Sequence, residues 1–206
     1  MKDLFTNLAL FIVLAIAFSS FTACNRTQQV ANGTGDANAP ANVDGANTGS
    51  RSADYPPAPS GILNGDFELL DGTMSKVADR KGKVVLVDLW GIWCGPCVAE
   101  MPALARLQTA YADKGFEIVG LNIGDSDGNP EDLAKIKAFG EKLNINYTLA
   151  RSKPAFTTLF YLLSRQQAVP QTFLIDREGH LRGVFVGGGQ KVMQSITQSV
   201  DKVMSE

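Results

Sequence analysis

From about residue 61 onwards, apolar residues fall into short continuous runs that alternate with segments of helical periodicity. The runs over residues 84–90 and 116–123 are almost entirely apolar, which predicts strands covered on both faces of a sheet. Between them, apolar residues recur at helical spacing, which predicts a helix over residues 97–111. Its inward-facing residues are Met101, Leu104, Leu107 and Tyr111. This alternation of strand and helix is typical of an α/β fold.

The remaining segments complete the sheet. Residues 67–70 and a short segment near Val77 predict an N-terminal β-hairpin, because the turn sequence Asp71-Gly72 lies between them. The segments after residue 128 predict a helix over 129–143, an edge strand over 147–149, a helix over 155–163, a hairpin of 172–176 with 181–186, and an amphipathic helix over 190–204. The pattern therefore predicts a mixed central sheet with helices on both faces.

The first 23 residues have the pattern of a secretory signal peptide. Lys2 precedes an uncharged apolar run over residues 8–18, and small residues follow this run. An uncleaved membrane helix is the alternative, although such a helix needs about 20 mainly apolar residues. Both interpretations predict an exported protein that works on the extracytoplasmic side of a membrane, such as the periplasm.

Residues 21–24 read Phe-Thr-Ala-Cys and resemble a bacterial lipobox. The resemblance implies that Cys24 is lipidated and becomes the mature N-terminus, anchored to a membrane by several acyl chains. The alternative is ordinary cleavage nearby, which would leave Cys24 as a free thiol. Residues 24–60 have almost nothing to bury, which predicts a disordered tether before one domain over residues 61–206.

The composition argues against several classes of function. The chain has 206 residues, with 19 Lys and Arg against 21 Asp and Glu, and a net charge of −2. No basic stripe is present, which argues against a dedicated nucleic-acid binder. One histidine and three cysteines are too few for most multi-ligand metal sites, so neither a metal nor another cofactor is expected. The single histidine, His180, is interpreted as a solvated turn residue.

Two of the cysteines, Cys94 and Cys97, stand between a predicted strand and the start of the next helix. They can close a small disulfide, and the unpaired N–H groups and dipole of the helix favour a thiolate at Cys94. Cys97 lies one turn later and can attack a mixed disulfide formed at Cys94. Pro96 fits the first helical turn, where its missing N–H would have no partner. A zinc site lacks a second cysteine pair, and two inert core thiols are the other alternative.

The segment around these cysteines resembles the active site of the thioredoxin superfamily. It covers residues 85–97 and reads Val-Leu-Val-Asp-Leu-Trp-Gly-Ile-Trp-Cys-Gly-Pro-Cys. From about residue 61 the whole chain resembles the exported, membrane-tethered TlpA/ResA-like thiol-disulfide oxidoreductases. The resemblance implies a thioredoxin-like three-layer fold with the N-terminal hairpin as an extension. It also implies a cis peptide before Pro170, a kink at Pro102 in the active-site helix and a glycine turn at residues 187–189.

The resemblance also implies a substrate-binding surface around the cysteine pair. A cis turn at Pro170 would bring the Val169 backbone beside the cysteines, where it can pair with an extended substrate strand. Trp93, Gly95 and Pro96 would complete this surface, with Trp93 as its apolar and partly exposed part.

Two carboxylates are candidates for proton transfer. Asp88 is the one charged residue in the apolar run over 84–90, so burial would raise its pKa toward neutrality. In thioredoxins an Asp at this position deprotonates the second cysteine, and ResA-like proteins have a Glu near the cysteines at the position of Glu100. The alternatives are a structural carboxylate with hydrogen-bond partners for Asp88 and an ordinary solvated helix charge for Glu100.

The uncharged dipeptide Gly95-Pro96 indicates a reductase, because strong oxidants owe their potential to a very stable thiolate. The resemblance implies substrate proteins with disulfides, as in cytochrome c maturation, and a membrane electron donor of the CcdA/DsbD type. A peroxidase is one alternative, but it would need an isolated peroxidatic cysteine. A non-enzymatic binding or metal-delivery lipoprotein is the other, although no histidine lies in a matching segment.

Overall fold

In the computed structural model, which describes residues 54–206, the apolar run Val84–Trp90 forms strand β3 and all seven of its residues are buried. β3 lies inside a seven-stranded mixed sheet with the order β2-β1-β5-β4-β3-β6-β7. It pairs in parallel with β4 and antiparallel with β6. The other strands are β1 (Phe67–Leu69), β2 (Met74–Ser75), β4 (Phe116–Asn122), β5 (Thr148–Arg151), β6 (Gln171–Ile175) and β7 (Leu181–Val186).

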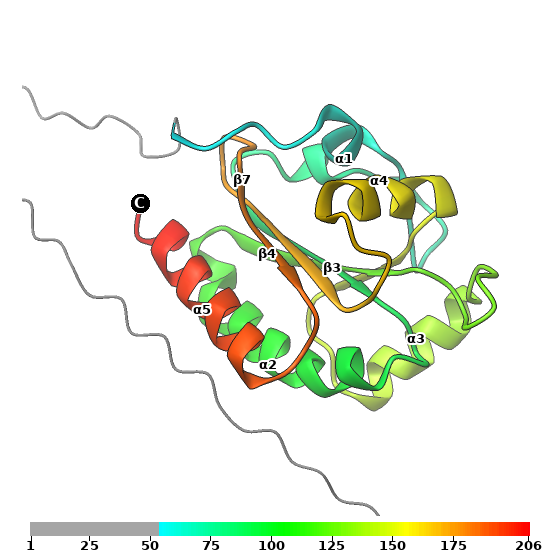
Figure 1. Ribbon diagram of the computed structural model, residues 1–206. Helices are drawn as coiled ribbons and strands as arrows, with labels where there is room; N and C mark the ends of the chain where they lie inside the picture. Colours follow the sequence, from blue (N-terminus) through cyan, green and yellow to red (C-terminus); the bar gives the residue numbers. More distant parts are fainter. Residues whose placement is uncertain (1–53) are drawn as a thin grey trace, which may run out of the picture. The chain divides into compact units, whose positions relative to one another are not determined.

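Helices cover both faces of this sheet (Figure 1). Helices α2, α3 and α5 pack on one face and helices α1 and α4 on the other, which is the predicted three-layer arrangement. Their bounds are α1 (Ser60–Asn64), α2 (Gly95–Tyr111), α3 (Leu133–Lys142), α4 (Pro154–Ser164) and α5 (Gln190–Met204), with 3₁₀ turns η2 (Val77–Arg80) and η3 (Ala112–Lys114). Pro102 lies inside α2, as predicted. Within residues 54–206, no helix has the length and apolar character needed to cross a bilayer.

Alternate residues of β3 face two separate hydrophobic cores. Leu86 and Trp90 pack against α2, α3 and α5, whereas Val87 and Leu89 pack against α1 and α4. A fully buried side chain of this size stabilises the fold by about 1.5–3 kcal/mol, so the strand is held from both sides. Because side chains alternate along a strand, Asp88 shares the face of Leu86 and Trp90 and is enclosed under α2.

The N-terminal hairpin is present, but two details of the prediction were wrong. Its second strand is Met74–Ser75, and Val77 lies in η2. β5 is not an edge strand, because it lies between β4 and β1 with Leu69 opposite Ala150. The hairpin adds to the outer side of β5, which the local sequence of β5 does not reveal.

The helix predicted from residue 129 begins later, at Leu133. The Asp132 carboxylate accepts hydrogen bonds from the N–H groups of Ala134 and Lys135, at 2.8 and 3.1 Å. These bonds satisfy two N–H groups of the first helical turn, and they fix the start of α3 there. Residues 129–130 belong to the preceding loop.

The folded unit begins before residue 61, where the sequence predicted its start. Pro57 forms a β-bridge with His180, and Ala58 is buried. The guanidinium carbon of Arg182 lies 4.0 Å from the ring centre of Tyr55. The predicted boundary is several residues too late, because even single apolar and aromatic residues in a polar segment gain free energy by burial. The predicted signal peptide over residues 1–23, Cys24 and the tether up to residue 53 lie outside the described residues.

Candidate functional site

Cys94 and Cys97 form a disulfide at the N-terminus of α2, which the sequence predicted as possible. Cys94 is the N-cap residue, and its Sγ accepts a 3.3 Å hydrogen bond from the Cys97 N–H. This donor and the helix dipole would favour a thiolate at Cys94 once the disulfide is reduced. Cys94 keeps 4% of its surface exposed and Cys97 none, so Cys94 is the sulfur that a partner can approach.

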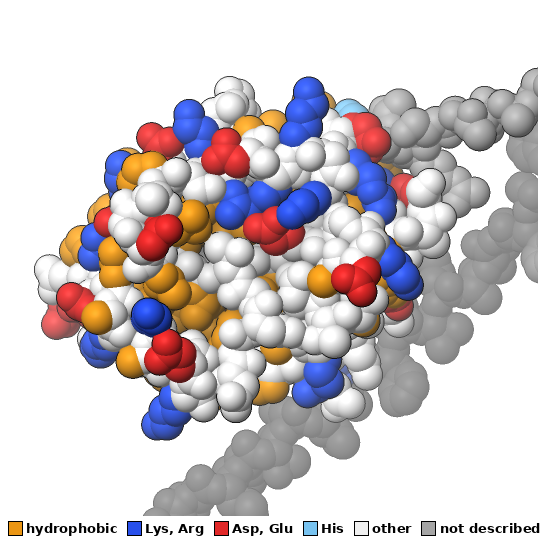
Figure 2. Space-filling model, turned by 180° about the vertical axis from the view of Figure 1, so that it is seen from behind, with side chains coloured by type: hydrophobic (Ala, Val, Ile, Leu, Met, Phe, Trp, Pro, Cys, Tyr) orange, Lys and Arg blue, Asp and Glu red, His pale blue; other side chains and the backbone are white. Residues whose placement is uncertain are grey.

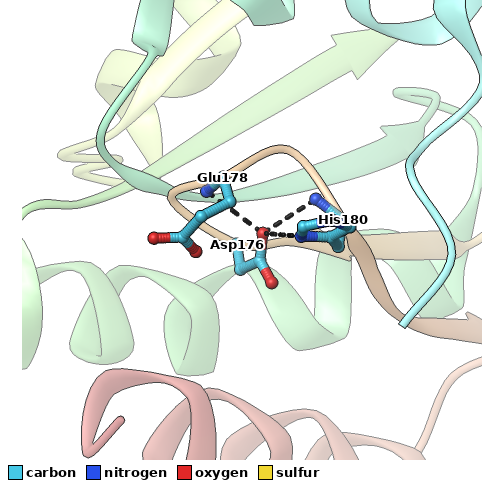
Figure 3. A group of neighbouring side chains, drawn as sticks. All are labelled: Asp176, Glu178 and His180. Carbon is cyan, nitrogen blue, oxygen red and sulfur yellow. Dashed lines mark hydrogen bonds and ion pairs between the residues drawn. The ribbon is translucent and has the colours of Figure 1, made fainter. Parts of the chain in front are cut away.

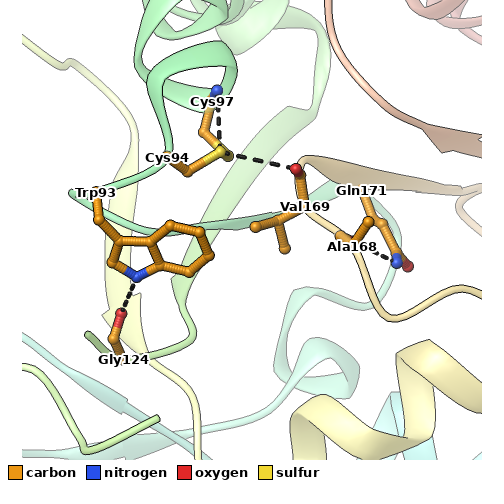
Figure 4. The surroundings of a disulfide bond; sticks show 7 residues. All are labelled: Trp93, Cys94, Cys97, Gly124, Ala168, Val169 and Gln171. Atoms are coloured by element: carbon orange, nitrogen blue, oxygen red, sulfur yellow. Dashed lines mark hydrogen bonds between the residues drawn. A yellow bond between two sulfur atoms is a disulfide. The ribbon is translucent and has the colours of Figure 1, made fainter. Parts of the chain in front are cut away.

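The segment before β6 lies against this disulfide (Figure 4). The Val169–Pro170 peptide is cis, as the resemblance implies. The carbonyl oxygen of Val169 lies 3.7 Å from Cys94 Sγ, so the backbone stands beside the cysteines. Gln171 secures the turn, because its Nε2 donates a 2.6 Å hydrogen bond to the carbonyl oxygen of Ala168.

Trp93, Gly95 and Pro96 form an exposed surface next to the disulfide. The Trp93 Nε1 donates a 2.9 Å hydrogen bond to the carbonyl oxygen of Gly124, although 49% of the tryptophan is exposed (Figure 4). A Cβ on Gly91 would lie 2.7 Å from this Nε1, so a glycine is needed to leave room for the indole. A Cβ on Gly95 would meet nothing within 4 Å, which indicates open space over the cysteine loop.

Asp88 is fully enclosed in β3. Neither of its carboxylate oxygens accepts a hydrogen bond from any side chain or backbone group of residues 54–206. Burial raises the pKa of Asp88 to about 7, so the carboxyl group can gain and lose a proton near neutrality. Within residues 54–206 no protein group therefore acts as the hydrogen-bond partner that a structural carboxylate would need.

Glu100, on α2, is only 5% exposed, and its oxygens also accept no hydrogen bond within residues 54–206. Burial raises its pKa to about 8, and the negative charge of Asp88 adds to the rise. Its Oε2 lies 3.4 Å from the position of a Cβ on Gly188, a position that is also close to Pro96 and Pro170. The glycine turn therefore closes over this carboxylate, and the alternative of a solvated helix charge is wrong.

Two further polar groups of this site were not predicted. The Tyr147 hydroxyl and the Trp90 Nε1 are buried and have no hydrogen-bond partner within residues 54–206. Burial raises the pKa of Tyr147, and the negative charges of Asp88 and Glu100 raise it further. The available signal was the polar tip of a tyrosine at the start of a short apolar segment, which is too weak to indicate a site.

Another group of potential ligands, Asp176, Glu178 and His180, lies at the turn between β6 and β7 (Figure 3). One ligand atom from each lies within 4.8 Å of the others. The Asp176 Oδ1 accepts hydrogen bonds from the backbone N–H groups of Glu178 and His180, at 3.2 and 2.7 Å, and an Arg182 nitrogen lies 3.3 Å from Oδ2. This carboxylate stabilises a turn beside a cation, so we assign no metal to it. His180 is half-buried, and its interpretation as a solvated turn residue was wrong.

Charged side chains of both signs are interspersed over the face of the molecule seen in Figure 2. This face shows no continuous basic stripe, in line with the net charge of −2.

Comparison with known proteins agrees with this site. Residues 61–184 match the AhpC/TSA family. The chain is 32% identical over 124 residues to the thioredoxin-like protein YneN of Bacillus subtilis, which covers 59% of this chain and 68% of YneN. It is 29% identical over 140 residues to the thiol-disulfide oxidoreductase ResA of Geobacillus thermodenitrificans, which covers 67% of this chain and 74% of ResA.

Solved structures share the fold. A thioredoxin-family thiol:disulfide interchange protein from Chlorobium tepidum has a TM-score of 0.59 at 26% identity, covering 73% of this chain and 97% of that one. A second structure from this organism, assigned to the thiol:disulfide interchange protein DsbE, has a TM-score of 0.60 at 27% identity, covering 73% and 96%. The chain therefore belongs to the AhpC/TSA family, and it is a thiol-disulfide oxidoreductase of the thioredoxin-like kind.

Proposed function

We propose that this protein reduces disulfides in exported proteins by means of Cys94 and Cys97. The observation that carries the proposal is the position of Cys94, which caps α2 with its Sγ 3.7 Å from the Val169 carbonyl oxygen. Such a site suits an extended polypeptide. The Val169 backbone can pair with a segment that contains a cystine, while the exposed indole of Trp93 contacts apolar side chains.

The first step is an attack of the reduced Cys94 thiolate on a disulfide of the substrate. A mixed disulfide forms between Cys94 and one substrate sulfur, and the other substrate sulfur leaves as a thiolate that takes a proton from solvent. The Cys97 N–H, which donates to Cys94 Sγ, and the α2 dipole stabilise the attacking thiolate.

The second step resolves this mixed disulfide through Cys97. The Cys97 thiol loses its proton to Asp88 or Glu100, and we assign both buried carboxylates to this role. Their raised pKa values, about 7 and about 8, match the acceptance of a thiol proton near neutral pH. The Cys97 sulfur then attacks Cys94, which closes their disulfide and releases the second substrate thiolate. Two electrons pass from the dithiol to the substrate.

The reducing direction rests on the charge around Cys94. Gly95 and Pro96 bring no charge into the loop that follows Cys94. A thiolate without a neighbouring cation is stabilised less than one beside cations. A less stabilised thiolate favours a reductant over a strong oxidant.

We further propose that the protein is exported and works attached to a membrane of the cell envelope. Residues 1–23 would direct export, and a lipidated Cys24 would anchor the domain to a membrane through the tether. An exported compartment is oxidising, so the dithiol would need electrons from a membrane donor of the CcdA/DsbD type. The signal-like pattern of residues 1–23 supports export, and the family resemblance favours cytochrome c maturation as the process.

The test is the reduction of insulin by the full chain, with dithiothreitol as the electron source. The wild type and Cys24→Ala, a matched control that removes the cysteine outside the pair, should both accelerate insulin precipitation. Cys94→Ser and Cys97→Ser should each lose about 100-fold in rate. Cys97→Ser should also retain partner proteins as mixed disulfides through Cys94. Equal activity of all four proteins would overturn the proposal.

Two further measurements decide the direction and the reaction class. A reduction potential above roughly −180 mV would reverse the reductant assignment. Faster consumption of hydrogen peroxide than of insulin disulfides, with the same thiol donor, would favour the peroxidase alternative. Neither measurement depends on knowing the natural substrate.

A further inference from the structure

Four side chains form what we call the buried polar cluster: Asp88, Trp90, Glu100 and Tyr147. Each is at most 8% exposed. The carboxylate oxygens, the indole Nε1 and the phenol hydroxyl have no hydrogen-bond partner within residues 54–206. Because buried polar atoms in folded proteins are almost always hydrogen-bonded, such a concentration of unpartnered atoms indicates a functional arrangement.

The register of the sheet brings three of these side chains together, those of Asp88, Trp90 and Tyr147. Asp88 on β3 lies opposite Gly120 on β4 in a parallel pair, so both positions face the same side of the sheet. A Cβ on Gly120 would lie 3.2 Å from both the Trp90 Nε1 and the Tyr147 Cε2. Because Gly120 has no side chain, the Trp90 indole nitrogen and the edge of the Tyr147 ring can both lie next to this position, which is paired with Asp88.

The charges around Tyr147 determine whether its hydroxyl acts as a hydrogen-bond donor. Among residues 54–206, the charged groups that act on its hydroxyl are Asp88 from β3 and Glu100 from α2, and β4 contributes only the uncharged Gly120 at this level. Burial and the two carboxylates raise the pKa of Tyr147 well above its usual value, so the phenol keeps its proton. A neutral phenol can donate a hydrogen bond to a carboxylate, and an ionised carboxylate can only accept.

We propose that Tyr147 is a positioning residue that donates its hydroxyl, through one bound water, to the ionised carboxylate of Asp88 or Glu100. It thereby sets the pH at which this pair takes the proton of Cys97. The inference rests on the proposed function, because it concerns the proton that leaves Cys97 in the resolving step. The O–H bond of Tyr147 stays intact throughout: the proton of Cys97 moves to the carboxylate and from there to solvent.

Tyr147→Phe tests the inference, because it keeps the ring in the core and removes only the hydroxyl. Without this donor the ionised carboxylate is less stable, so the pair should lose its proton at a higher pH. A hydrogen bond of ordinary strength to a charged group predicts a rise of about one pH unit in the midpoint of the pH–rate profile. A tyrosine that only fills space would leave the midpoint where it is.

The experiment compares the pH profiles of insulin reduction by the wild type, Tyr147→Phe and the matched control Tyr161→Phe. Tyr161 is partly buried and packs against the core on the other face of the sheet, so loss of its hydroxyl should not move the midpoint. A Tyr147→Phe profile that superposes on that of the wild type would overturn the inference and leave the proposed function standing. Inactivity of the wild type itself would overturn the proposed function instead.

A second measurement decides the case in which Tyr147→Phe does not fold. In wild-type protein with ¹³C at tyrosine Cζ, the Tyr147 signal should change at the pH at which the carboxyl carbons of Asp88 and Glu100 titrate. The phenol should remain protonated through that change. A Tyr147 signal that is insensitive to the titration of both carboxylates would refute its role as their hydrogen-bond donor.

Discussion

The indole Nε1 of Trp93 donates a 2.9 Å hydrogen bond to the carbonyl oxygen of Gly124. The Gly124 N–H in turn donates to the Asn122 Oδ1 at 2.9 Å, which ties the loop to the last residue of β4. The exposed ring beside Cys94 is thus held in one orientation before a partner arrives. Such preorganisation lowers the entropy that binding would otherwise cost.

Gly91→Ala should displace this ring without unfolding the protein. A Cβ at residue 91 would lie 2.7 Å from the Trp93 Nε1, and the half-exposed indole can move outward. We expect the KM for insulin to rise about 3- to 10-fold with little change in kcat, because binding is weakened while the cysteines are untouched. Steady-state kinetics measure this. In a Trp93→Phe background, Gly91→Ala should add little, and fully additive losses would contradict the explanation.

Asp88→Asn should stabilise the disulfide form at alkaline pH. Burial raises the pKa of Asp88 from 3.8 to about 7, so between these values the folded protein holds a proton that the unfolded chain has released. The free energy of unfolding therefore falls as the pH rises through this window, and it stays lower above it. Because Asn carries no charge, we expect a gain of about 4 kcal/mol at pH 9 and almost none at pH 4. Urea denaturation at both pH values gives the comparison, and an equal gain at both would assign the effect to packing.

The same substitution should lower the pKa of Glu100. Burial is the first cause of its raised pKa of about 8, and the negative charge of Asp88 is the second. Without that charge, Glu100 should titrate below pH 8 but still above its usual 4.5, because it remains buried. The ¹³C signal of the Glu100 carboxyl carbon in Asp88→Asn follows this titration. A midpoint at or above the wild-type value would mean that the two carboxylates do not interact.

The cysteine pair and the strand before it could be predicted because their chemistry is local. An apolar run of seven residues needs cover on both faces wherever it lies, and the burial of Asp88 follows from its position in that run. Two cysteines one turn apart at a helix start carry their geometry with them, so their pairing did not depend on distant parts of the chain.

The rest of the site depends on contacts between segments that are far apart in sequence. The atom that holds Trp93 is a backbone carbonyl of Gly124, which no residue type indicates. Tyr147 reaches the level of Asp88 only because Gly120 lacks a side chain and β5 lies beside β4, and β5 was itself predicted as an edge. The burial of Glu100 likewise depends on the glycine turn at residues 187–189, which packs over its carboxylate but lies far from it in the sequence.

Cys24→Ala should abolish incorporation of labelled palmitate in a bacterial host that processes lipoproteins. The wild type should be labelled and should sediment with membranes, because several acyl chains on one residue anchor a protein firmly. Cys94→Ser is the control, since it removes a cysteine from the redox pair and should be labelled like the wild type. Equal labelling of Cys24→Ala would exclude this residue as the site of lipidation.

Removal of residues 1–58 should destabilise the domain more than removal of residues 1–53. The segment between these two starts is attached at the β6–β7 turn: Leu181 N–H donates to the Pro56 carbonyl oxygen, and Ala58 N–H donates to that of Gly179, both at 2.9 Å. With the burial of Ala58 and the contact of Tyr55 with Arg182, these bonds predict a loss of about 2 kcal/mol in the free energy of unfolding.

The shorter chain should nevertheless reduce insulin with an unchanged kcat, because its lost contacts lie at the far end of the sheet from the disulfide. In the antiparallel pair of β3 and β6, Ile175 lies opposite Val85, at the start of β3, whereas the cysteines follow the end of β3. Urea denaturation and insulin kinetics on the two truncated chains separate these effects. Equal stability of the two chains would mean that residues 54–58 belong to the tether. A lower kcat of the shorter chain would mean that contacts at this end of the sheet affect the redox site.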